Sequence, residues 1–224
     1  MIITIDGPAG SGKSTAAREL AEALGIAYLD TGATYRAVTL AALRSGVDLA
    51  DEAALARLAG GLDIRLEPAG GQLRVLLDGE DVTREIRSAE VSDNSHYIAR
   101  AAAVRELLVP MQRRMGDDLA RKTGGVVAEG RDQGSVVFPQ ADLKFYLDAA
   151  PEVRARRRHD EMAADGEEVR YEDVLQAVVT RDGRDRSRAV APLVKPDGAI
   201  EIDTTGLDIP EVTAELRRQV ERAR

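Results

Sequence analysis

Short runs of apolar residues alternate with longer segments of helical periodicity along most of this chain. The apolar runs are rich in Val, Ile, Leu and Ala, which predicts buried strands. The predicted strands lie at 1–6, 25–29, 126–129, 143–147 and 200–202. The predicted helices lie at 16–24, about 31–45, a pair from 88 that ends at Gly124, 151–164, an Arg-rich segment around 181–188, and from 210 onward. This alternation predicts an α/β fold with a doubly wound parallel sheet.

The alternation is interrupted between about residues 47 and 102. An Ala-rich helix is predicted over 47–62, and strand-like runs follow it at 63–68, 72–78 and 79–83. A Gly-rich turn at 69–71 joins the two longer runs, so they predict an antiparallel hairpin. Gly70-Gly71-Gln72 echoes part of the transporter-ATPase signature, but it precedes a strand instead of opening a helix. We predict a single domain over 1–224 with an inserted region at about 47–102.

Composition narrows the class of protein. The chain has 224 residues, of which 44% are hydrophobic, so it can bury a sizeable core. Its formal net charge of −8 is opposite to that of most nucleic-acid binders. It has no Cys, which excludes disulfides and thiol nucleophiles, and no apolar run approaches the ~20 residues that span a bilayer. We expect a cytoplasmic monomer that binds small molecules, without nucleic-acid or membrane partners.

The first predicted strand runs directly into Gly-Pro-Ala-Gly-Ser-Gly-Lys-Ser-Thr at residues 7–15. In this G-x-x-x-x-G-K-S spacing, backbone N–H groups turn inward around phosphate oxygens at the N-terminus of a helix. The pattern predicts bound ATP, with Lys13 reaching the β- and γ-phosphates and Ser14 joining a Mg²⁺ shell. The alternative is a Gly-rich surface turn. The residues assigned to ATP are Gly7, Gly10, Ser11, Gly12, Lys13, Ser14 and Thr15.

Charged residues follow the predicted strands at 25–29 and 126–129. Ligands in open α/β sheets bind outside the carboxyl ends of the strands, so these side chains are predicted to face the ATP site. The alternative is that they belong to a solvated helix and a surface loop. Thr31 is predicted to cap the helix after the first of these strands through its hydroxyl. The charged residues concerned are Arg36, Glu129, Arg131 and Asp132.

Arginines are concentrated in two predicted helices of the C-terminal half. Charged stripes are usually solvated helix faces, and that interpretation holds for most of these residues. Their density in an acidic chain nevertheless favours an anionic partner, which a mobile lid over ATP would bind. We predict such a lid at about 154–168. The arginines are Arg154, Arg156, Arg157 and Arg158 in the first helix, and Arg181, Arg184, Arg186 and Arg188 in the second.

The chain lacks a guanine-recognition motif and an evident general base, and both absences favour phosphoryl transfer to an acceptor that is already ionised. The Asn-Lys-x-Asp motif of guanine-specific GTPases is absent, because Asn94 is the only Asn in the chain. No His, Lys or Glu stands out as a general base. An acceptor that is itself a phosphate monoester needs no base, because its second pKa is about 6. Catalysis then requires charge neutralisation by Lys13, Mg²⁺ and arginines from separate segments.

Four segments of the chain resemble the bacterial cytidylate kinases, which belong to the nucleoside-monophosphate kinase group. Together they span nearly the whole chain in the family's order. The most specific is Arg-Asp-Gly-Arg-Asp-Arg-Ser-Arg-Ala-Val-Ala-Pro-Leu, and the segments are 5–15, 29–36, 129–139 and 181–193. The resemblance implies a P-loop kinase fold with an inserted monophosphate-binding region and a helical lid. It also implies ATP-dependent phosphorylation of CMP and dCMP to their diphosphates.

The resemblance further implies roles for single residues. Those implied to hold the CMP phosphate are Arg36, Arg131 and Arg188, and those implied to contact the ribose are Arg181 and Asp185. Those implied to read the cytosine edge are Arg105 and Asp132, in a pocket lined by Thr31 and Tyr35. The residues assigned to catalysis are Lys13, Arg131, Arg157 and Arg188, with Arg157 in the lid. The chain departs from the family pattern at His96, where a Ser in contact with the base is expected.

Two other functions stay open at this point. A P-loop kinase could serve another small acceptor, such as UMP or an alcohol, and an alcohol would need a carboxylate base, for which Asp132 is the candidate. A nucleotide sensor would bind ATP without turnover. Steady-state assays with ATP and a series of monophosphates separate these possibilities.

Overall fold

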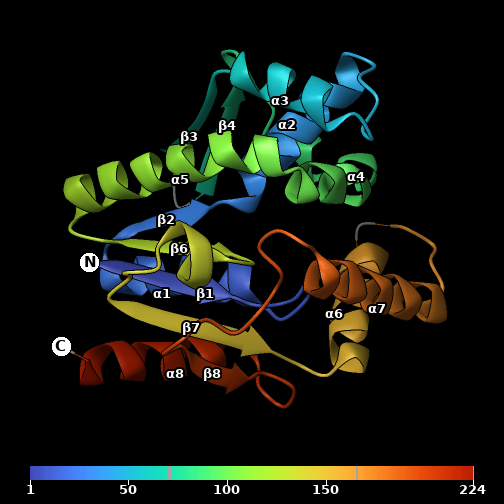
Figure 1. Cartoon of the computed structure of the whole chain (residues 1–224). Coiled ribbons are helices and arrows are strands. Elements are labelled where there is room, and N and C mark those ends of the chain that lie inside the picture. The colour runs from blue at the N-terminus through green and yellow to red at the C-terminus, as the bar shows by residue number, and fades with distance from the viewer. Residues whose placement is uncertain (70–71, 165, 224) are drawn as a thin grey trace.

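The computed structural model describes residues 1–69, 72–164 and 166–223 (Figure 1). The strands of the main sheet are β1 (Ile2–Asp6), β2 (Ala27–Asp30), β6 (Val126–Gly130), β7 (Leu143–Asp148) and β8 (Ile200–Asp203). A smaller sheet contains β3 (Ile64–Ala69), β4 (Gln72–Leu77) and β5 (Glu80–Asp81). The helices are α1 (Lys13–Leu24), α2 (Gly32–Arg44), α3 (Glu52–Gly60), α4 (Ala89–Arg100), α5 (Ala102–Thr123), α6 (Pro151–Ala164), α7 (Tyr171–Ser187) and α8 (Ile209–Arg222), with short helical turns η1 (Glu85–Arg87) and η2 (Gln133–Val137).

The strands of the main sheet are parallel and follow the order β2-β6-β1-β7-β8. In the central pair, Asp6 at the end of β1 lies opposite Gly130 at the end of β6. Asp30 at the end of β2 lies opposite Glu129. The carboxyl ends of β1, β2 and β6 therefore meet at one edge, where ligands bind in open α/β sheets. The predicted doubly wound parallel sheet is confirmed.

Helices cover both faces of the main sheet because its central strands are apolar on both sides. On one face, Val127 of β6 belongs to a buried cluster with Leu20 of α1 and Leu216 of α8. On the other face, the neighbouring Val126 packs in a cluster with Leu119 of α5. Figure 1 shows α5 crossing above β2 and β6, and α8 beside β8 at the bottom of the view.

The region above the main sheet in Figure 1 has an apolar core of its own. Buried side chains from α2, α3, β4 and α4 meet there, among them Val38, Leu55, Val75 and Ile98. Strands β3 and β4 pair antiparallel, as in the predicted hairpin, whereas Gly70 and Gly71 of its predicted turn lie outside the described residues. The limits of the insert at about 47–102 stay a prediction, since this core also includes α2.

The helix predicted over 47–62 is shorter in the structure, where α3 spans Glu52–Gly60. Asp51 caps its N-terminus by accepting a hydrogen bond from the backbone N–H of Ala54 at 2.9 Å. Just before it, the Asp48 side chain accepts from the N–H of Ala50 at 2.9 Å and forms a turn. Short acidic side chains that bind their own backbone therefore delay the helix start.

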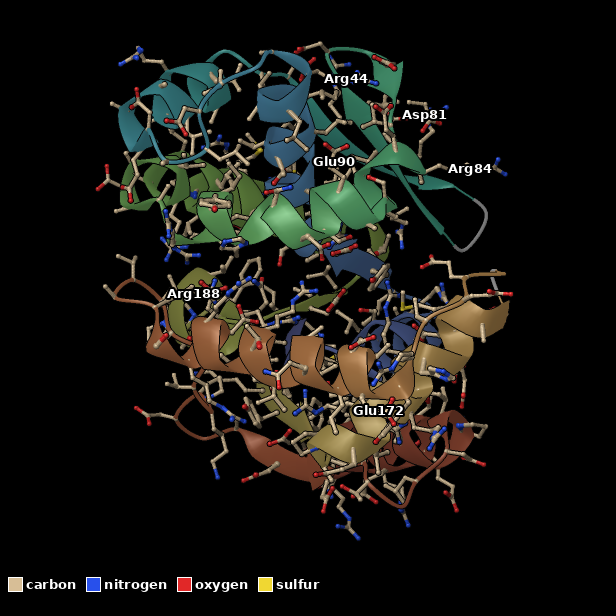
Figure 2. The ribbon with its side chains drawn as sticks, turned by 90° about the vertical axis from the view of Figure 1, so that its right-hand side faces the viewer. Arg44, Asp81, Arg84, Glu90, Glu172 and Arg188 are labelled. Atoms are coloured by element: carbon tan, nitrogen blue, oxygen red, sulfur yellow. The ribbon has the colours of Figure 1, made fainter. Side chains whose placement is uncertain are left out.

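Helices α6 and α7 pack together beside the carboxyl edge of the main sheet. Ala155 of α6 and Val174 and Val178 of α7 form a small buried cluster between them. Figure 2 views this edge and shows Arg188, just after α7, on the side that faces α4. Among the described residues, no helix combines the length and apolar character that a membrane crossing needs.

Candidate active site

The loop predicted to bind phosphate lies between β1 and α1, and α1 begins at Lys13. Gly12 precedes the helix with a φ of 82°, a left-handed conformation that favours glycine. Gly7 lies so close to β7 that a Cβ would sit 2.0 Å from the carbonyl oxygen of Leu147. The loop thus requires glycine at both ends, and it leads directly into the N-terminus of a helix, an arrangement that favours bound anions.

Lys13 is a buried cation at the start of α1. Its Nζ donates a hydrogen bond to the carbonyl oxygen of Pro8 at 3.1 Å. Burial, together with the positive charge of Arg131, lowers the pKa of Lys13 to about 7. An opposite charge nearby favours the charged form of an amine, so a triphosphate in the loop would restore the positive charge of Lys13.

Ser14 and Glu129 bring oxygen ligands to the same place. The Ser14 hydroxyl donates to Oε1 of Glu129 at 2.8 Å, and the Tyr28 hydroxyl donates to the same oxygen at 3.3 Å. Hydroxyl and carboxylate oxygens suit Mg²⁺, which usually keeps several waters and binds substrate phosphates. In the part of the chain that the structure describes, no cluster of at least 3 His, Cys, Asp or Glu could hold a metal ion. The residues therefore fit a cation that is also bound by phosphate oxygens.

Three arginines surround Asp185 of α7. Arg131, from the loop after β6, donates through Nε to Oδ2 of Asp185 at 3.0 Å, and Nη2 of Arg188 lies 3.9 Å from Oδ1. Burial opposes the ionisation of Asp185, but the arginines outweigh it and lower its pKa. Desolvation by the surrounding residues, together with the positive charge of Arg131, lowers the pKa of Arg181 to about 10. The cluster has more cationic groups than anionic ones, as a phosphate site requires.

Arg36 of α2 lies near the same strand ends. Its Nη2 forms an ion pair with Oδ2 of Asp30 at 2.6 Å, and Arg87 approaches that oxygen to 4.0 Å. The Nε of Arg36 is buried without a hydrogen-bond partner among the described residues. The positive charge of Arg36 also contributes to the lowered pKa of Arg181, so the two arginines lie close enough for their charges to interact.

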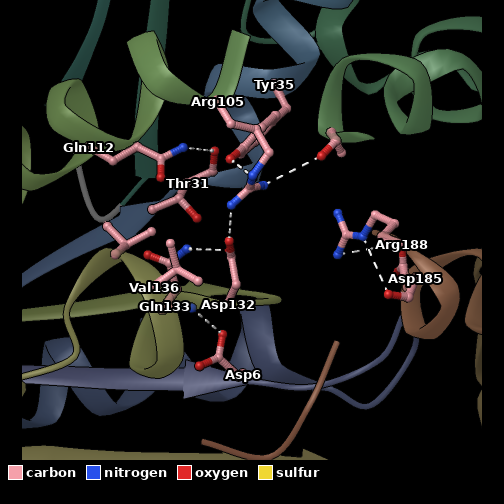
Figure 3. Close-up of polar contacts among 12 residues, drawn as sticks. Asp6, Thr31, Tyr35, Arg105, Gln112, Asp132, Gln133, Val136, Asp185 and Arg188 are labelled. Carbon is pink, nitrogen blue, oxygen red and sulfur yellow. Dashed lines mark hydrogen bonds and ion pairs between the residues drawn. The ribbon is translucent and has the colours of Figure 1, made fainter. Parts of the chain in front are cut away.

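A buried ion pair between Arg105 of α5 and Asp132 forms the centre of a polar network (Figure 3). Arg105 also donates through Nη1 to the hydroxyl of Tyr35 at 2.9 Å. Gln112, also on α5, donates to the hydroxyl of Thr34 at 2.8 Å. The four residues predicted to form the base pocket come together here, and they are Thr31, Tyr35, Arg105 and Asp132.

Thr31 occupies the N-cap position of α2, but the predicted capping by its hydroxyl is wrong. Thr31 has helical backbone angles, and its hydroxyl donates to the carbonyl oxygen of Glu129 at 2.8 Å. The N–H of Ala33 is satisfied instead by Oδ1 of Asp30 at 3.1 Å. Thr31 therefore ties the start of α2 to the end of β6, and its partner is too remote in sequence for a local pattern to indicate.

Sequence reasoning missed two residues behind Asp132. Asp6 is fully buried and accepts hydrogen bonds from the N–H groups of Gln133 and Gly134, both at 2.7 Å. The Gln133 side chain amide lies 3.5 Å from Oδ1 of Asp132. Burial raises the pKa of Asp6 to about 7. An acidic residue that ends an otherwise apolar strand was the available signal for Asp6, whereas nothing local indicated Gln133.

Two arginines of the predicted lid contact the rest of the protein. Arg157 donates through Nη2 to the carbonyl oxygens of Thr204 and Leu207 at 2.6 and 3.1 Å. Its Nη1 lies 3.9 Å from where a Cβ of Gly12 would stand, so Arg157 adjoins the phosphate-binding loop. Arg154 is buried beneath that loop. The lid at about 154–168 stays a prediction.

Comparison with known proteins agrees with these features. The family model described as Cytidylate kinase matches residues 3–222. A cytidylate kinase of Pelotomaculum thermopropionicum is 49% identical over 223 residues, covering 99% of this chain and 96% of that protein. A cytidylate kinase of Desulforamulus reducens is 48% identical over 222 residues, covering 99% and 97%.

Among solved structures, an uncharacterized protein from Eubacterium ventriosum has a TM-score of 0.50 at 13% identity, covering 99% of this chain and 98% of that one. That likeness concerns the fold alone. The sequence matches extend over nearly the whole chain, and on that basis the chain belongs to the cytidylate kinase family.

Proposed function

We propose that this protein transfers the γ-phosphoryl group of ATP to CMP and dCMP, producing CDP and dCDP. Family membership supports this reaction. One observation carries the two-substrate site: Gly130, directly before Arg131, lies opposite Asp6, directly before the phosphate-binding loop. The arginine cluster around Asp185 therefore adjoins the phosphate-binding loop, and two polyanions fit side by side.

The proposed transfer needs no general base. The second pKa of a phosphate monoester is about 6, so the attacking oxygen of the acceptor is already ionised at neutral pH. The protein must bring two anions together and neutralise the charge on the transferring group. The residues that we assign to this task are Lys13, Arg131, Arg157 and Arg188.

The acceptor nucleotide is proposed to lie between α2, α5 and α7. Its phosphate would be held by Arg36 and Arg188, each with a buried nitrogen that has no hydrogen-bond partner among the described residues, together with Arg131. Guanidinium groups bind phosphate oxygens with paired donors, which fixes the orientation of the phosphate. The ribose contacts are assigned to Arg181 and Asp185, which follow one another on α7 by about one turn.

The Arg105–Asp132 pair suits the edge of cytosine. Cytosine presents an exocyclic amine that donates, beside a ring nitrogen and O2 that accept, and a carboxylate next to a guanidinium answers that pattern. Uracil would place an acceptor against Asp132. Thr31 and Tyr35 line this proposed pocket. His96 of α4 stands where the resemblance implies a Ser in contact with the base.

Mg²⁺ is proposed to accompany ATP. The Ser14 hydroxyl and the Glu129 carboxylate would hold it, because they already share a hydrogen bond next to the phosphate-binding loop. When bound, the ion neutralises charge on the β- and γ-phosphates. Asp132 is not assigned to this ion, since its carboxylate is paired with Arg105. The remaining elements of the proposal are a lid at about 154–168, a monomeric state and a cytoplasmic location.

Steady-state kinetics with ATP and CMP, dCMP, UMP or AMP test the proposed function. We expect kcat/KM for CMP and dCMP to exceed that for UMP by roughly 10–100-fold, the range for one mispaired buried hydrogen-bonding group. A preference for UMP would contradict the cytosine assignment. A nucleotide sensor would bind ATP but would not release ADP when CMP is added. The Lys13→Ala variant gives the background rate of ADP release.

A further inference from the structure

Arg154 is a charged side chain in a place where arginine is rarely found. It lies on the first turn of α6, it is 1% exposed, and it belongs to the largest fully buried side chains of the protein. Its guanidinium forms a two-pronged ion pair with Asp182 of α7, which is itself 3% exposed. The bond from Nη1 to Oδ1 measures 3.1 Å, and Nη2 donates to Oδ2.

The same guanidinium reaches the phosphate-binding loop. Its Nη1 donates to the carbonyl oxygen of Ala9 at 3.0 Å, and its Nε donates to that of Ala149 at 2.8 Å. The loop also packs closely against α6, because a Cβ at Gly10 would lie only 3.0 Å from the Cβ of Arg154. Arg154 therefore connects the donor loop to the end of β7 and to α7.

The other end of the connection carries the proposed acceptor site. Asp182 directly follows Arg181 on α7, and Asp185 lies one turn beyond it. A shift of Asp182 along or around the axis of α7 would move both residues with it. The guanidinium is planar and its donors form a rigid fork, so the pair fixes both distance and orientation.

Burial alone does not explain this pair. Taking two charges out of water is costly, and apolar residues of similar volume often replace a buried ion pair without loss of stability. What apolar residues do not supply is directional contact with both Ala9 and Asp182. In-line transfer needs reacting atoms about 3–3.5 Å apart, and a misplacement of about 1 Å can lower the rate about 10²-fold.

We propose that Arg154 and Asp182 form a positioning pair, which holds the ATP-binding loop and the acceptor-binding helix α7 in register for phosphoryl transfer. The inference rests on the proposed function, because it takes ATP and a nucleoside monophosphate as the two substrates. Neither residue touches substrate in this proposal. Both act through the backbone of the loop and through the side chains of α7.

The test compares the double variant Arg154→Met/Asp182→Leu with wild type in the full-length protein. We expect a folded protein whose dissociation constants for ATP and CMP, each measured alone, change by less than about threefold. We expect kcat to fall roughly 10–100-fold. A purely structural role would lower the melting temperature and leave kcat of the folded fraction unchanged, and that result would overturn the proposal.

Arg154→Lys decides the question if the double variant does not fold. It keeps the charge but loses the fork, so kcat should fall at least about fivefold with little change in either dissociation constant. Wild-type kcat in Arg154→Lys would count against the proposal. The control is Arg217→Met on α8, because Arg217 is exposed and its ion pair with Glu221 lies on the surface, away from the proposed site.

The wild-type assay separates this test from the proposed function. If wild type prefers UMP, the cytosine assignment fails, and the variants are then compared with UMP as acceptor. A loss of kcat with that acceptor would still support the positioning pair.

Discussion

Two buried side chains of the site, Lys13 and Asp6, have pKa values near 7 for related reasons. Burial disfavours the charged form of either group, so it lowers the pKa of the lysine and raises that of the carboxyl. For Lys13, the positive charge of Arg131 adds to the effect. For Asp6, the N–H groups of Gln133 and Gly134 oppose it. Each group therefore changes charge close to neutral pH.

Binding of ATP should return a proton to Lys13. At about pH 8 a lysine with a pKa of about 7 is mostly neutral, and the phosphates of ATP would raise that pKa again. We expect an uptake approaching one proton per ATP, measured by titration calorimetry in buffers of different ionisation enthalpy. Lys13→Met should bind ATP without this uptake. Equal proton uptake in both proteins would assign the titration to another group.

The stability of the protein should reflect the titration of Asp6. Its pKa is raised from 3.8 to about 7, so the folded state binds this proton more tightly than the unfolded chain. The stabilising contribution is therefore present at low pH and is lost as the pH rises through 7. Relative to Asp6→Asn, wild type should lose roughly 2 kcal/mol of unfolding free energy between about pH 5 and 8.

Urea unfolding of both proteins at several pH values measures this difference. Parallel pH profiles for wild type and Asp6→Asn would show that Asp6 does not titrate in this range. Groups other than Asp6 titrate in both proteins, so the difference between the two pH profiles isolates the contribution of Asp6.

The types of residue in the site could be predicted more readily than their partners. Lys13, Arg36 and Asp132 follow strand ends, and strand ends are visible as breaks in apolar runs. The hydroxyl of Thr31 bonds to Glu129, and Arg154 bonds to Asp182, across long sequence separations. Local propensity carries no information about such pairs, because they form only when the sheet and the helices have packed.

At the scale of elements, α5 passes very close to the segment that follows β6. Gly116 of α5 lies against the ring of Phe138, where a Cβ would stand 2.5 Å from Cζ. The ring is buried in the cluster beneath α5, so moving it aside would disturb the packing of that cluster. Glycine is therefore needed inside this helix in spite of its low helix propensity.

Gly116→Ala should destabilise the protein although alanine favours helices. We expect a loss of about 1–3 kcal/mol in unfolding free energy, the range for overpacking a core. The matched control is Gly183→Ala on α7, where a Cβ would have no neighbour within 4 Å in the part of the chain that the structure describes. That variant should gain about 0.5–1 kcal/mol from helix propensity. Denaturant unfolding measures both, and a gain in both variants would refute the close packing of α5.

The order and type of the main elements could be predicted because apolar periodicity differs between buried strands and helices. Their exact beginnings depended on side chains that compete for backbone N–H groups. The delayed start of α3, set by Asp48 and Asp51, is one example. The shared core of α2, α3, β4 and α4 is another feature that no local pattern indicated, because its members are distant in sequence.

At the scale of the whole molecule, the sign of the net charge differs from the sign of the local charge at the proposed acceptor site. The protein has a net charge of −8, yet the proposed acceptor site gathers several arginines around one carboxylate. A substrate anion approaching at long range meets an acidic protein. Within a few ångströms of the site it meets local positive charge, which is the field that determines binding.

Added salt should therefore weaken acceptor binding in spite of the acidic total. Between about 0.1 M and 1 M salt the screening length falls from about 10 Å to 3 Å. We expect KM for CMP to rise several-fold and kcat at saturation to change little, as measured by initial rates in KCl. A KM that falls with salt would mean that repulsion by the net charge of −8 outweighs the arginine cluster.

The ion pair between Arg36 and Asp30 has a consequence for which molecules can compete for the site. Before any ligand arrives, this guanidinium is already engaged at 2.6 Å. An incoming phosphate would have to displace Asp30, and Arg87, at 4.0 Å from the same oxygen, is near enough to replace Arg36. One ion pair is exchanged for another, so the gain at Arg36 is modest, and the affinity for the phosphate must come mainly from the proposed contacts with Arg131 and Arg188. A nucleoside has no phosphate for these two arginines, so free cytidine should be a poor inhibitor although it carries the same base.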